Sequence, residues 1–245
     1  MAVAGRRAAR RSVTEGAPLI VAIDGPSGVG KSAAARELAR RLGLPVLETG
    51  AMYRAVGWKT LETGVDPADA EAVSRLVEDL DLALELDGRG RYRVLLDGRR
   101  CGEELYRPEV ARRTSQVARI EAVRRDLVRR QREVAHRAGA VVEGRDIGTV
   151  VFPDTPFKFF LEAEPRVRAE RRWQQEREAG GFPDLAEILA AVEERDARDA
   201  GREHSPLRRD DSYVVVDTSR LTREEVVEEL VRRMEDARAE QRGTS

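Results

Sequence analysis

The chain has 245 residues, and its 44 Lys and Arg residues nearly balance its 45 Asp and Glu residues, giving a formal net charge of -1. This balance gives no global electrostatic basis for a nucleic-acid or membrane partner, and no run of about 18 apolar residues could form a transmembrane helix. The single cysteine, Cys101, excludes an intrachain disulfide and favours a reducing, cytoplasmic compartment, while the length suits one α/β domain with insertions.

Residues 1–17 form an arginine-rich start that continues with Ser-Val-Thr-Glu-Gly and not with the apolar segment of a signal peptide. A functional basic arm is one interpretation, but the polar composition favours a disordered extension. We expect the folded domain to span residues 18–240.

A strand, a glycine-rich loop and a helix come first in the domain. The run 19–23 is short, apolar and β-branched, as in a strand buried on both faces of a parallel sheet. After the loop, residues 31–42 keep an apolar stripe at helical spacing until Gly43 and Pro45 end it.

The pattern then changes twice. A short strand at 46–47 and helices at 51–61 and 67–80 are followed by alternating apolar residues at 82–86 and 92–96, separated by Asp87-Gly88-Arg89-Gly90. This alternation with a glycine turn predicts a β-hairpin. A β-rich stretch inside an α/β chain indicates an insertion.

The remaining elements restore the alternation of helices and strands. We expect helices at 108–117 and 121–138, strands at 140–142 and 157–161, a helical hairpin at 165–207 broken at Gly180-Gly181, and finally a strand at 213–216 and a helix at 222–239. Most arginines between Arg124 and Arg132 are interpreted as a solvated helix face. The alternation predicts an α/β fold with a parallel sheet flanked by helices.

The loop Gly25-Pro-Ser-Gly-Val-Gly-Lys31-Ser32 fills the pattern GxxxxGK[ST] between a strand and a helix. Its glycines let backbone N–H groups surround a phosphate, Lys31 is suited to the β- and γ-phosphates of ATP, and the Ser32 hydroxyl is suited to Mg²⁺. A tight structural turn is the alternative, which the complete motif disfavours. Asp24 could approach the metal or the acceptor, or could cap the local backbone. The predicted ATP-binding residues are Gly25, Pro26, Ser27, Gly28, Val29, Gly30, Lys31, Ser32 and Ala33, with Ser32 as the metal ligand.

A P-loop alone leaves the acceptor open, but four further segments narrow it. Glu48-Thr-Gly-Ala-Met-Tyr-Arg54, Glu143-Gly-Arg-Asp-Ile-Gly-Thr-Val-Val-Phe-Pro153, Arg195-Asp-Ala-Arg-Asp-Ala-Gly-Arg202 and Ser205-Pro-Leu207 follow the P-loop in order. Together with it they resemble the bacterial cytidylate kinases, from about residue 19 to residue 238. Glu48 departs from the family pattern, in which Asp is common.

The resemblance implies a P-loop core sheet, a β-containing monophosphate-binding insert at about 63–104 and a helical lid at about 165–207. It also implies transfer of the γ-phosphate of Mg·ATP to CMP or dCMP. The residues implied to act in catalysis are Lys31, Arg145, Arg195 and Arg202. The residues implied to bind the acceptor are Thr49, Tyr53, Arg54, Ser115, Arg124, Arg145, Asp146, Arg195, Asp199 and Arg202.

These residue types suit the implied ligands. Several guanidiniums provide forked donors for a dianionic phosphate. Asp146 can accept from the cytosine N4 amino group, while Ser115 and Arg124 can complete the base edge. By resemblance Asp199 lies near the ribose. At least one of Arg168, Arg171 and Arg172 is expected to reach the phosphates, whereas His136 and His204 have no expected catalytic role.

Two other interpretations remain open. An acceptor such as AMP, UMP or shikimate would keep the kinase chemistry, and a P-loop switch protein would hydrolyse ATP slowly without a small acceptor. The Gly144-Arg-Asp-Ile-Gly-Thr149 stretch and the β-rich insert disfavour another acceptor, and the arginine-rich acceptor residues disfavour a switch protein. The absence of a sustained heptad pattern favours a monomer.

Overall fold

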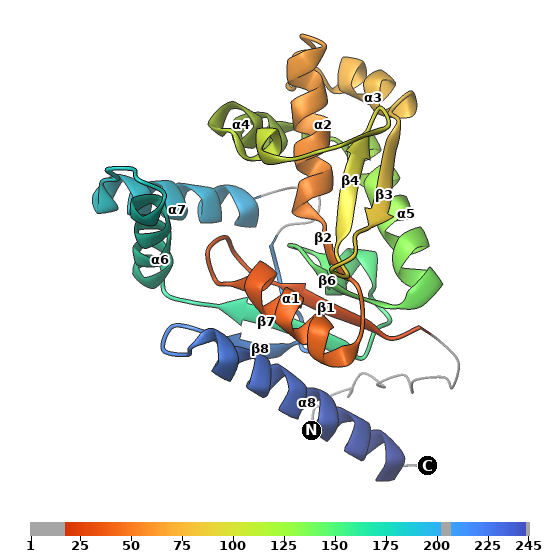
Figure 1. The fold of residues 1–245 in the computed structure, drawn as a ribbon, viewed down its shortest axis with the longest axis vertical. Helices are drawn as coiled ribbons and strands as arrows, with labels where there is room; N and C mark the ends of the chain where they lie inside the picture. Colours follow the sequence, from red (N-terminus) through yellow and green to blue (C-terminus); the bar gives the residue numbers. More distant parts are fainter. Residues whose placement is uncertain (1–17, 202–206, 244–245) are drawn as a thin grey trace, which may run out of the picture.

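The central sheet of the protein is parallel and has five strands (Figure 1). The computed structural model describes residues 18–201 and 207–243. The strands lie in the order β2-β6-β1-β7-β8, and every neighbouring pair is parallel. Their bounds are β1 Ile20–Asp24, β2 Val46–Glu48, β6 Ala140–Glu143, β7 Phe157–Glu162 and β8 Val214–Asp217.

Alternate residues of β1 face two different cores. Val21 and Ile23 pack in a cluster with α1 (Lys31–Leu42) and α8 (Arg223–Gly243), whereas Ile20 and Ala22 pack in a cluster with α2 (Gly50–Glu62) and α5 (Glu121–Ala138). Because side chains of a strand alternate between the faces of the sheet, both faces must be covered by helices. The apolar run 19–23 is explained by this three-layer arrangement.

An insertion follows β2 and rises from the sheet at the top of Figure 1. It contains a three-stranded antiparallel sheet in the order β3-β4-β5. None of the helices in the described part of the chain, inside the insertion or outside it, is long and apolar enough to cross a membrane. The elements of the insertion and the helix that returns to the core are α2 Gly50–Glu62, α3 Ala70–Glu78, β3 Leu82–Leu86, β4 Tyr92–Leu96, β5 Arg99–Arg100, the 3₁₀ turn η1 Glu103–Tyr106, α4 Pro108–Val117 and α5 Glu121–Ala138.

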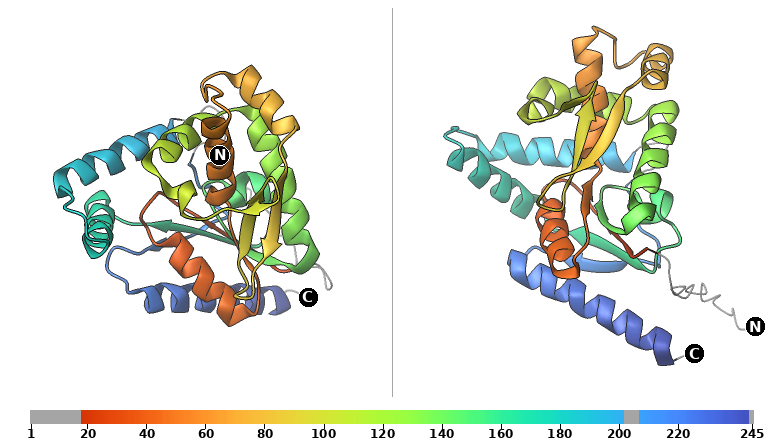
Figure 2. Two further views of the ribbon diagram at one scale, coloured as in Figure 1. Left: turned by 45° about the horizontal axis from the view of Figure 1, so that its top comes forward. Right: turned by 45° about the vertical axis from the view of Figure 1, so that its right-hand side comes forward.

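Helices α6 (Pro165–Glu178) and α7 (Leu185–Ala200) form a hairpin that projects to one side of the sheet (Figures 1 and 2). Ala169, Ile188 and Val192 form a small apolar core of their own between the two helices. This hairpin and the insertion lie on either side of the P-loop, so both can contribute residues to one site.

Most of the expected elements are present, and the differences have local causes. Helix α3 starts at Ala70 and not at 67, because the Asp69 carboxylate accepts hydrogen bonds from the N–H groups of Glu71 and Ala72 and so fixes the N-cap. The solvated face expected for the α5 arginines is only partly right. Arg130 and Arg132 donate to backbone carbonyls of Leu80, Leu82, Val150 and Val151 and thereby join α5 to its neighbours.

Candidate active site

The P-loop lies between β1 and α1 and has a backbone that only glycine can follow. Gly25 has φ 145°, and a Cβ atom there would lie 2.1 Å from the Leu161 carbonyl oxygen. Gly30, with φ 93°, is the residue that precedes the first turn of α1. A left-handed residue at this point turns the loop so that the N-terminus of α1 faces a cavity, which Gly30, Lys31 and Ser32 line. A helix N-terminus in this position suits an anion.

Lys31 is buried and donates from Nζ to the carbonyl oxygen of Pro26 over 2.6 Å. Burial, reinforced by the positive charge of Arg145, holds the pKa of the Lys31 ammonium group well below its usual range. A buried ammonium group among guanidiniums is unfavourable. An anion in the cavity would relieve this cost.

Glu143 lines the cavity, although it is not among the site residues that the sequence predicts. It ends β6, the strand beside β1, and its Oε1 accepts a 2.9 Å hydrogen bond from the Ser32 hydroxyl. Its backbone oxygen accepts from the Thr49 hydroxyl over 2.9 Å. A sequence signal for Glu143 is present, namely an acidic residue at the end of an apolar strand. Such a residue lies near the P-loop if its strand is parallel to the P-loop strand and next to it, because both strands then end at the same edge of the sheet.

Tyr53 and Arg54 come from the first turns of α2. Arg54 donates to the Leu105 carbonyl oxygen over 3.3 Å, and its guanidinium lies 5.1 Å from the ring centroid of Tyr106. Burial lowers the pKa of the Arg54 guanidinium. Helix α2 therefore presents an aromatic ring and a cation to the cavity from the side of the insertion.

Arg124 and Asp146 form a buried ion pair. The Arg124 guanidinium also lies 5.9 Å from the ring centroid of Tyr53, so an aromatic ring, a forked donor and a carboxylate meet at one point. Such a pair is costly to desolvate. It presents hydrogen-bonding groups of both kinds to a planar polar ligand.

Arg168, Arg171 and Arg172 of α6 have three different environments. Arg168 is buried, donates to the Ser27 and Ala163 carbonyl oxygens and pairs with Asp196 of α7 over 2.5 Å. Arg171 donates to the carbonyl and hydroxyl oxygens of Thr218, and Arg172 pairs with Glu176 at the surface. Of the three, only Arg171 lines the cavity in the described part of the chain.

One cavity of about 710 Å³ brings most of the expected site residues together. They are Ser27, Gly28, Val29, Gly30, Lys31, Ser32, Ala33, Thr49, Tyr53, Arg54, Ser115, Arg124, Arg145, Asp146 and Arg195. Arg202 lies outside the described residues, as do His204 and the side chain of Asp199. His136 packs edge-on against Phe152, with ring centroids 5.7 Å apart.

Asp24, for which a metal-binding and a capping interpretation were open, has a capping role in the structure. It is fully buried, and both carboxylate oxygens accept backbone N–H bonds, Oδ1 from Ile147 and Oδ2 from Gly148, each over 2.8 Å. The Tyr213 hydroxyl donates to Oδ2 over 2.7 Å. Asp24 does not line the cavity.

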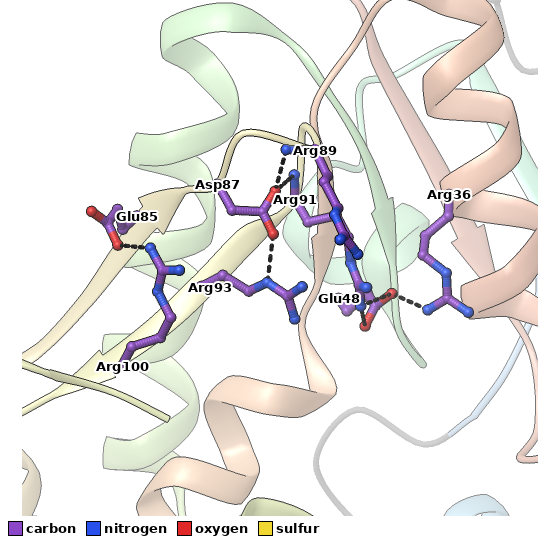
Figure 3. A network of polar contacts seen from close by, with 8 residues as sticks. All are labelled: Arg36, Glu48, Glu85, Asp87, Arg89, Arg91, Arg93 and Arg100. Carbon is purple, nitrogen blue, oxygen red and sulfur yellow. Dashed lines mark hydrogen bonds and ion pairs between the residues drawn. The ribbon is translucent and has the colours of Figure 1, made fainter. Parts of the chain in front are cut away.

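Glu48 joins the insertion to the P-loop helix (Figure 3). Its carboxylate pairs with Arg36 of α1 over 2.5 Å and with Arg91, at the tip of the β3–β4 hairpin, over 3.3 Å. The hairpin tip also accepts a hydrogen bond from the Val46 N–H through the Gly90 carbonyl oxygen, over 2.9 Å. The tip is thus attached to the strand that leads into α2.

Comparisons with known proteins identify relatives along most of the chain. The family model described as cytidylate kinase matches residues 21–236. A cytidylate kinase of Corynebacterium efficiens is 47% identical over 214 residues, which is 87% of this chain and 93% of that protein. A cytidylate kinase of Rhodococcus opacus is also 47% identical, with the same coverage. A bifunctional pantoate ligase/cytidylate kinase of Prochlorococcus marinus is 46% identical over 86% of this chain, which spans 42% of that longer protein.

Proposed function

The chain belongs to the cytidylate kinase family, and from this we propose that it transfers the γ-phosphate of Mg·ATP to CMP or dCMP, producing CDP or dCDP and ADP. The observation that carries the proposal is the buried Arg124–Asp146 pair, because it faces the same cavity as the P-loop. A kinase for a polar base needs both a phosphate loop and a base-reading pair within one cavity. The cavity volume of about 710 Å³ lies within the range of about 300–1,000 Å³ that is usual for ligand pockets.

Cytosine presents an amino donor at N4 beside acceptors at N3 and O2. In the proposed complex the Asp146 carboxylate accepts from N4, and Arg124 and Ser115 donate to the acceptors. Tyr53 provides a ring surface beside them. Uracil carries an acceptor at position 4 and a donor at N3, so it would leave these buried protein groups without partners.

The phosphate of the acceptor is proposed to lie among Arg54, Arg145 and Arg195, with Arg202 as a further ligand. Arg145 follows β6 by two residues, and Arg195 reaches the cavity from α7. Guanidiniums keep their charge in a buried site and bind phosphate oxygens in pairs. Their number suits the charge of two nucleotides brought together.

ATP is proposed to bind through the P-loop backbone and Lys31. Ser32 and Glu143 suit a magnesium ion, because this cation prefers oxygen ligands such as hydroxyl and carboxylate groups. The Ser32 Oγ and Glu143 Oε1 atoms lie 2.9 Å apart beside the P-loop. When bound, the ion would neutralise charge on the phosphates of ATP. Ser32 is the ligand that the sequence predicts, and Glu143 adds a carboxylate to it.

The protein is proposed to act by positioning and charge neutralisation. An oxygen of the acceptor phosphate forms the new bond to the γ-phosphorus, while the bond from that phosphorus to the bridging oxygen of ADP breaks. Lys31 and the arginines stabilise the negative charge on the transferred group. Because these residues align the phosphate of the acceptor nucleotide for attack, we expect little ATP hydrolysis when no acceptor nucleotide is bound.

The first experiment is a coupled ADP-release assay with Mg·ATP that compares CMP, dCMP, UMP, AMP and no acceptor. We expect rapid turnover with CMP and dCMP only. Asp146→Ala should lower kcat/KM for CMP by about 10²-fold or more, because the base and Arg124 both lose their partner. Asp79→Ala, at an exposed residue at the end of α3, is the matched control and should behave as the wild type.

Asp146→Ala leaves Arg124 buried without its partner, so Asp146→Asn is the second variant. It keeps the side-chain volume and one acceptor oxygen, and we expect a smaller loss than for alanine. A preference for another monophosphate would retain the kinase activity but contradict the cytosine assignment. Turnover that is independent of any acceptor would indicate an ATPase instead.

A further inference from the structure

Asp24 connects three parts of the chain that are far apart in sequence. It ends β1, it accepts the N–H groups of Ile147 and Gly148, and it accepts the hydroxyl of Tyr213, the residue before β8. Each of these hydrogen bonds is 2.7 or 2.8 Å long. Both carboxylate oxygens accept hydrogen bonds from the protein and Asp24 does not line the cavity, so its role in the structure is to hold the backbone.

The segment that Asp24 holds follows Asp146 directly. Ile147–Val151 is a single π-helical turn, and the Asp146 carbonyl oxygen accepts from the N–H groups of Val150 and Val151. The first N–H groups of a helical turn have no partner within that turn. Asp24 provides the partner for two of them and so fixes the backbone on the C-terminal side of Asp146.

Tyr213 closes the other side of this arrangement. It is 8% exposed, and its ring packs edge-on against Phe160 with centroids 6.0 Å apart. A Cβ atom on Gly148 would lie 2.6 Å from the Tyr213 hydroxyl oxygen, so the segment packs directly against the tyrosine. Burial and the neighbouring Asp24 raise the pKa of the Tyr213 phenol, which keeps it a hydrogen-bond donor.

Neither Asp24 nor Tyr213 lines the cavity, whereas Asp146 does. The side chain of Asp146 is held by Arg124, and the backbone after it is held by Asp24. Two independent constraints therefore determine where the Asp146 carboxylate points. A shift of a base-reading group by a fraction of an ångström weakens its hydrogen bonds to a ligand.

We propose that Asp24 and Tyr213 are positioning residues for base recognition: they fix the 146–148 segment so that Asp146 and Arg124 together read the acceptor base. The inference rests on the proposed function and extends it to two residues that touch neither substrate. Tyr213 is the more selective probe of the two. Asp24 precedes the P-loop, but Tyr213 reaches the segment from the opposite end of the chain.

The test compares Tyr213→Phe and Asp24→Asn with the wild type. Steady-state assays give KM for CMP, KM for ATP and the ratio of kcat/KM for CMP to that for UMP. We expect Tyr213→Phe to raise KM for CMP and to lower the CMP/UMP ratio, each about fivefold, because the hydrogen bond from the phenol to the Asp24 carboxylate is lost. KM for ATP should stay within about twofold, because the P-loop is unchanged. Asp24→Asn should have a larger effect, since both carboxylate oxygens accept from donors and the amide NH₂ that replaces either of them cannot accept.

The matched control is Tyr92→Phe in β4. Among the described residues no group forms a hydrogen bond with the Tyr92 hydroxyl, so the variant should keep wild-type selectivity. Amide hydrogen exchange at Ile147 and Gly148 is the structural measurement. It should accelerate in Asp24→Asn and Tyr213→Phe and stay unchanged in Tyr92→Phe.

The outcomes separate this inference from the proposed function. A wild-type enzyme without preference for CMP over UMP overturns both. A selective wild type together with a folded Tyr213→Phe variant of unchanged selectivity overturns the positioning role alone. Equal increases in KM for ATP and CMP would also overturn it, because they would indicate general loosening. Faster amide exchange at Ile147 and Gly148, together with a lower CMP/UMP ratio and an unchanged KM for ATP, supports the positioning role.

Discussion

The buried cations in and beside the cavity differ in how their charge is compensated. Arg124 pairs with Asp146 and Arg168 pairs with Asp196, whereas Lys31 donates to a backbone carbonyl. A buried charge is stable when a counter-charge or several hydrogen bonds compensate it. We infer that Arg168 fixes the α6–α7 hairpin relative to the P-loop, and that a bound phosphate would compensate the charge of Lys31.

Asp24 makes stability depend on pH, with a sign set by burial. Burial raises the pKa of its carboxyl from 3.8 to about 6, against the lowering effect of the Gly148, Ile147 and Tyr213 hydrogen bonds, and the nearby charge of Asp146 raises it further. The positive charge of Lys31 also interacts electrostatically with the Asp24 carboxylate. Since the folded-state pKa is above that of the unfolded chain, this contribution to stability is fully present below about pH 3.8 and is lost as pH rises through about 6.

The measurement is the free energy of unfolding in urea at pH 5.0 and 7.5, for the wild type and Asp24→Asn. The wild-type value minus the variant value should fall by about 1.5 kcal/mol across this interval, because only the wild type releases the Asp24 proton. Using the difference cancels the titration of all other groups. A constant difference would show that Asp24 does not titrate in this range, as expected if its hydrogen bonds outweigh burial and keep the carboxyl ionised already at pH 5.0.

At the scale of elements, the β3–β4 hairpin is attached to the core through its tip, and this attachment sets the start of α2. Glu48 has a side chain that is 16% exposed and pairs with Arg36 and Arg91 (Figure 3). Glu48→Gln should raise KM for CMP about five- to tenfold, because loss of a partly buried pair loosens the insertion that carries Tyr53 and Arg54. KM for ATP should change less than about twofold. Steady-state kinetics at a fixed saturating level of the other substrate gives both values.

Glu85→Gln is the control for this prediction, since it also removes a carboxylate that pairs with an arginine of the insertion. Its pair with Arg100 is about half exposed on both sides, and exposed pairs contribute little. We expect wild-type kinetics for it. Equal effects of the two substitutions would attribute the result to the loss of any carboxylate paired with the insertion and would contradict a specific role for Glu48.

Elements with strong local signals could be predicted from the sequence. Helices α4 and α5 lie at 108–117 and 121–138 as expected, because their apolar spacing and first-turn residues are local features. Strand β5, with only two residues, was not predicted, nor was the π-helical turn after Asp146, whose partner Asp24 lies 123 residues away. The bond from Ser32 to Glu143 spans 111 residues and depends on β6 lying beside β1. Sequence patterns alone do not determine that order.

At the scale of the whole molecule, three parts of the chain line one cavity. The P-loop core contributes Lys31, the insertion contributes Arg54 and helix α7 contributes Arg195. Like charges gathered in this way repel one another in the free protein, and the two nucleotides together would neutralise them. Each nucleotide is therefore expected to favour the arrangement that binds the other.

This expectation gives a test by thermal unfolding. We expect CMP and a non-hydrolysable ATP analogue together to raise Tm by about 2–4 °C more than the sum of their separate shifts, as a coupling free energy of about 1 kcal/mol would do. Arg195→Met should reduce this excess while leaving the shift with the ATP analogue alone within about 1 °C, because the P-loop of the variant is intact. Additive shifts in the wild type would show that the two sites are independent and that closure around one nucleotide does not prepare the cavity for the other.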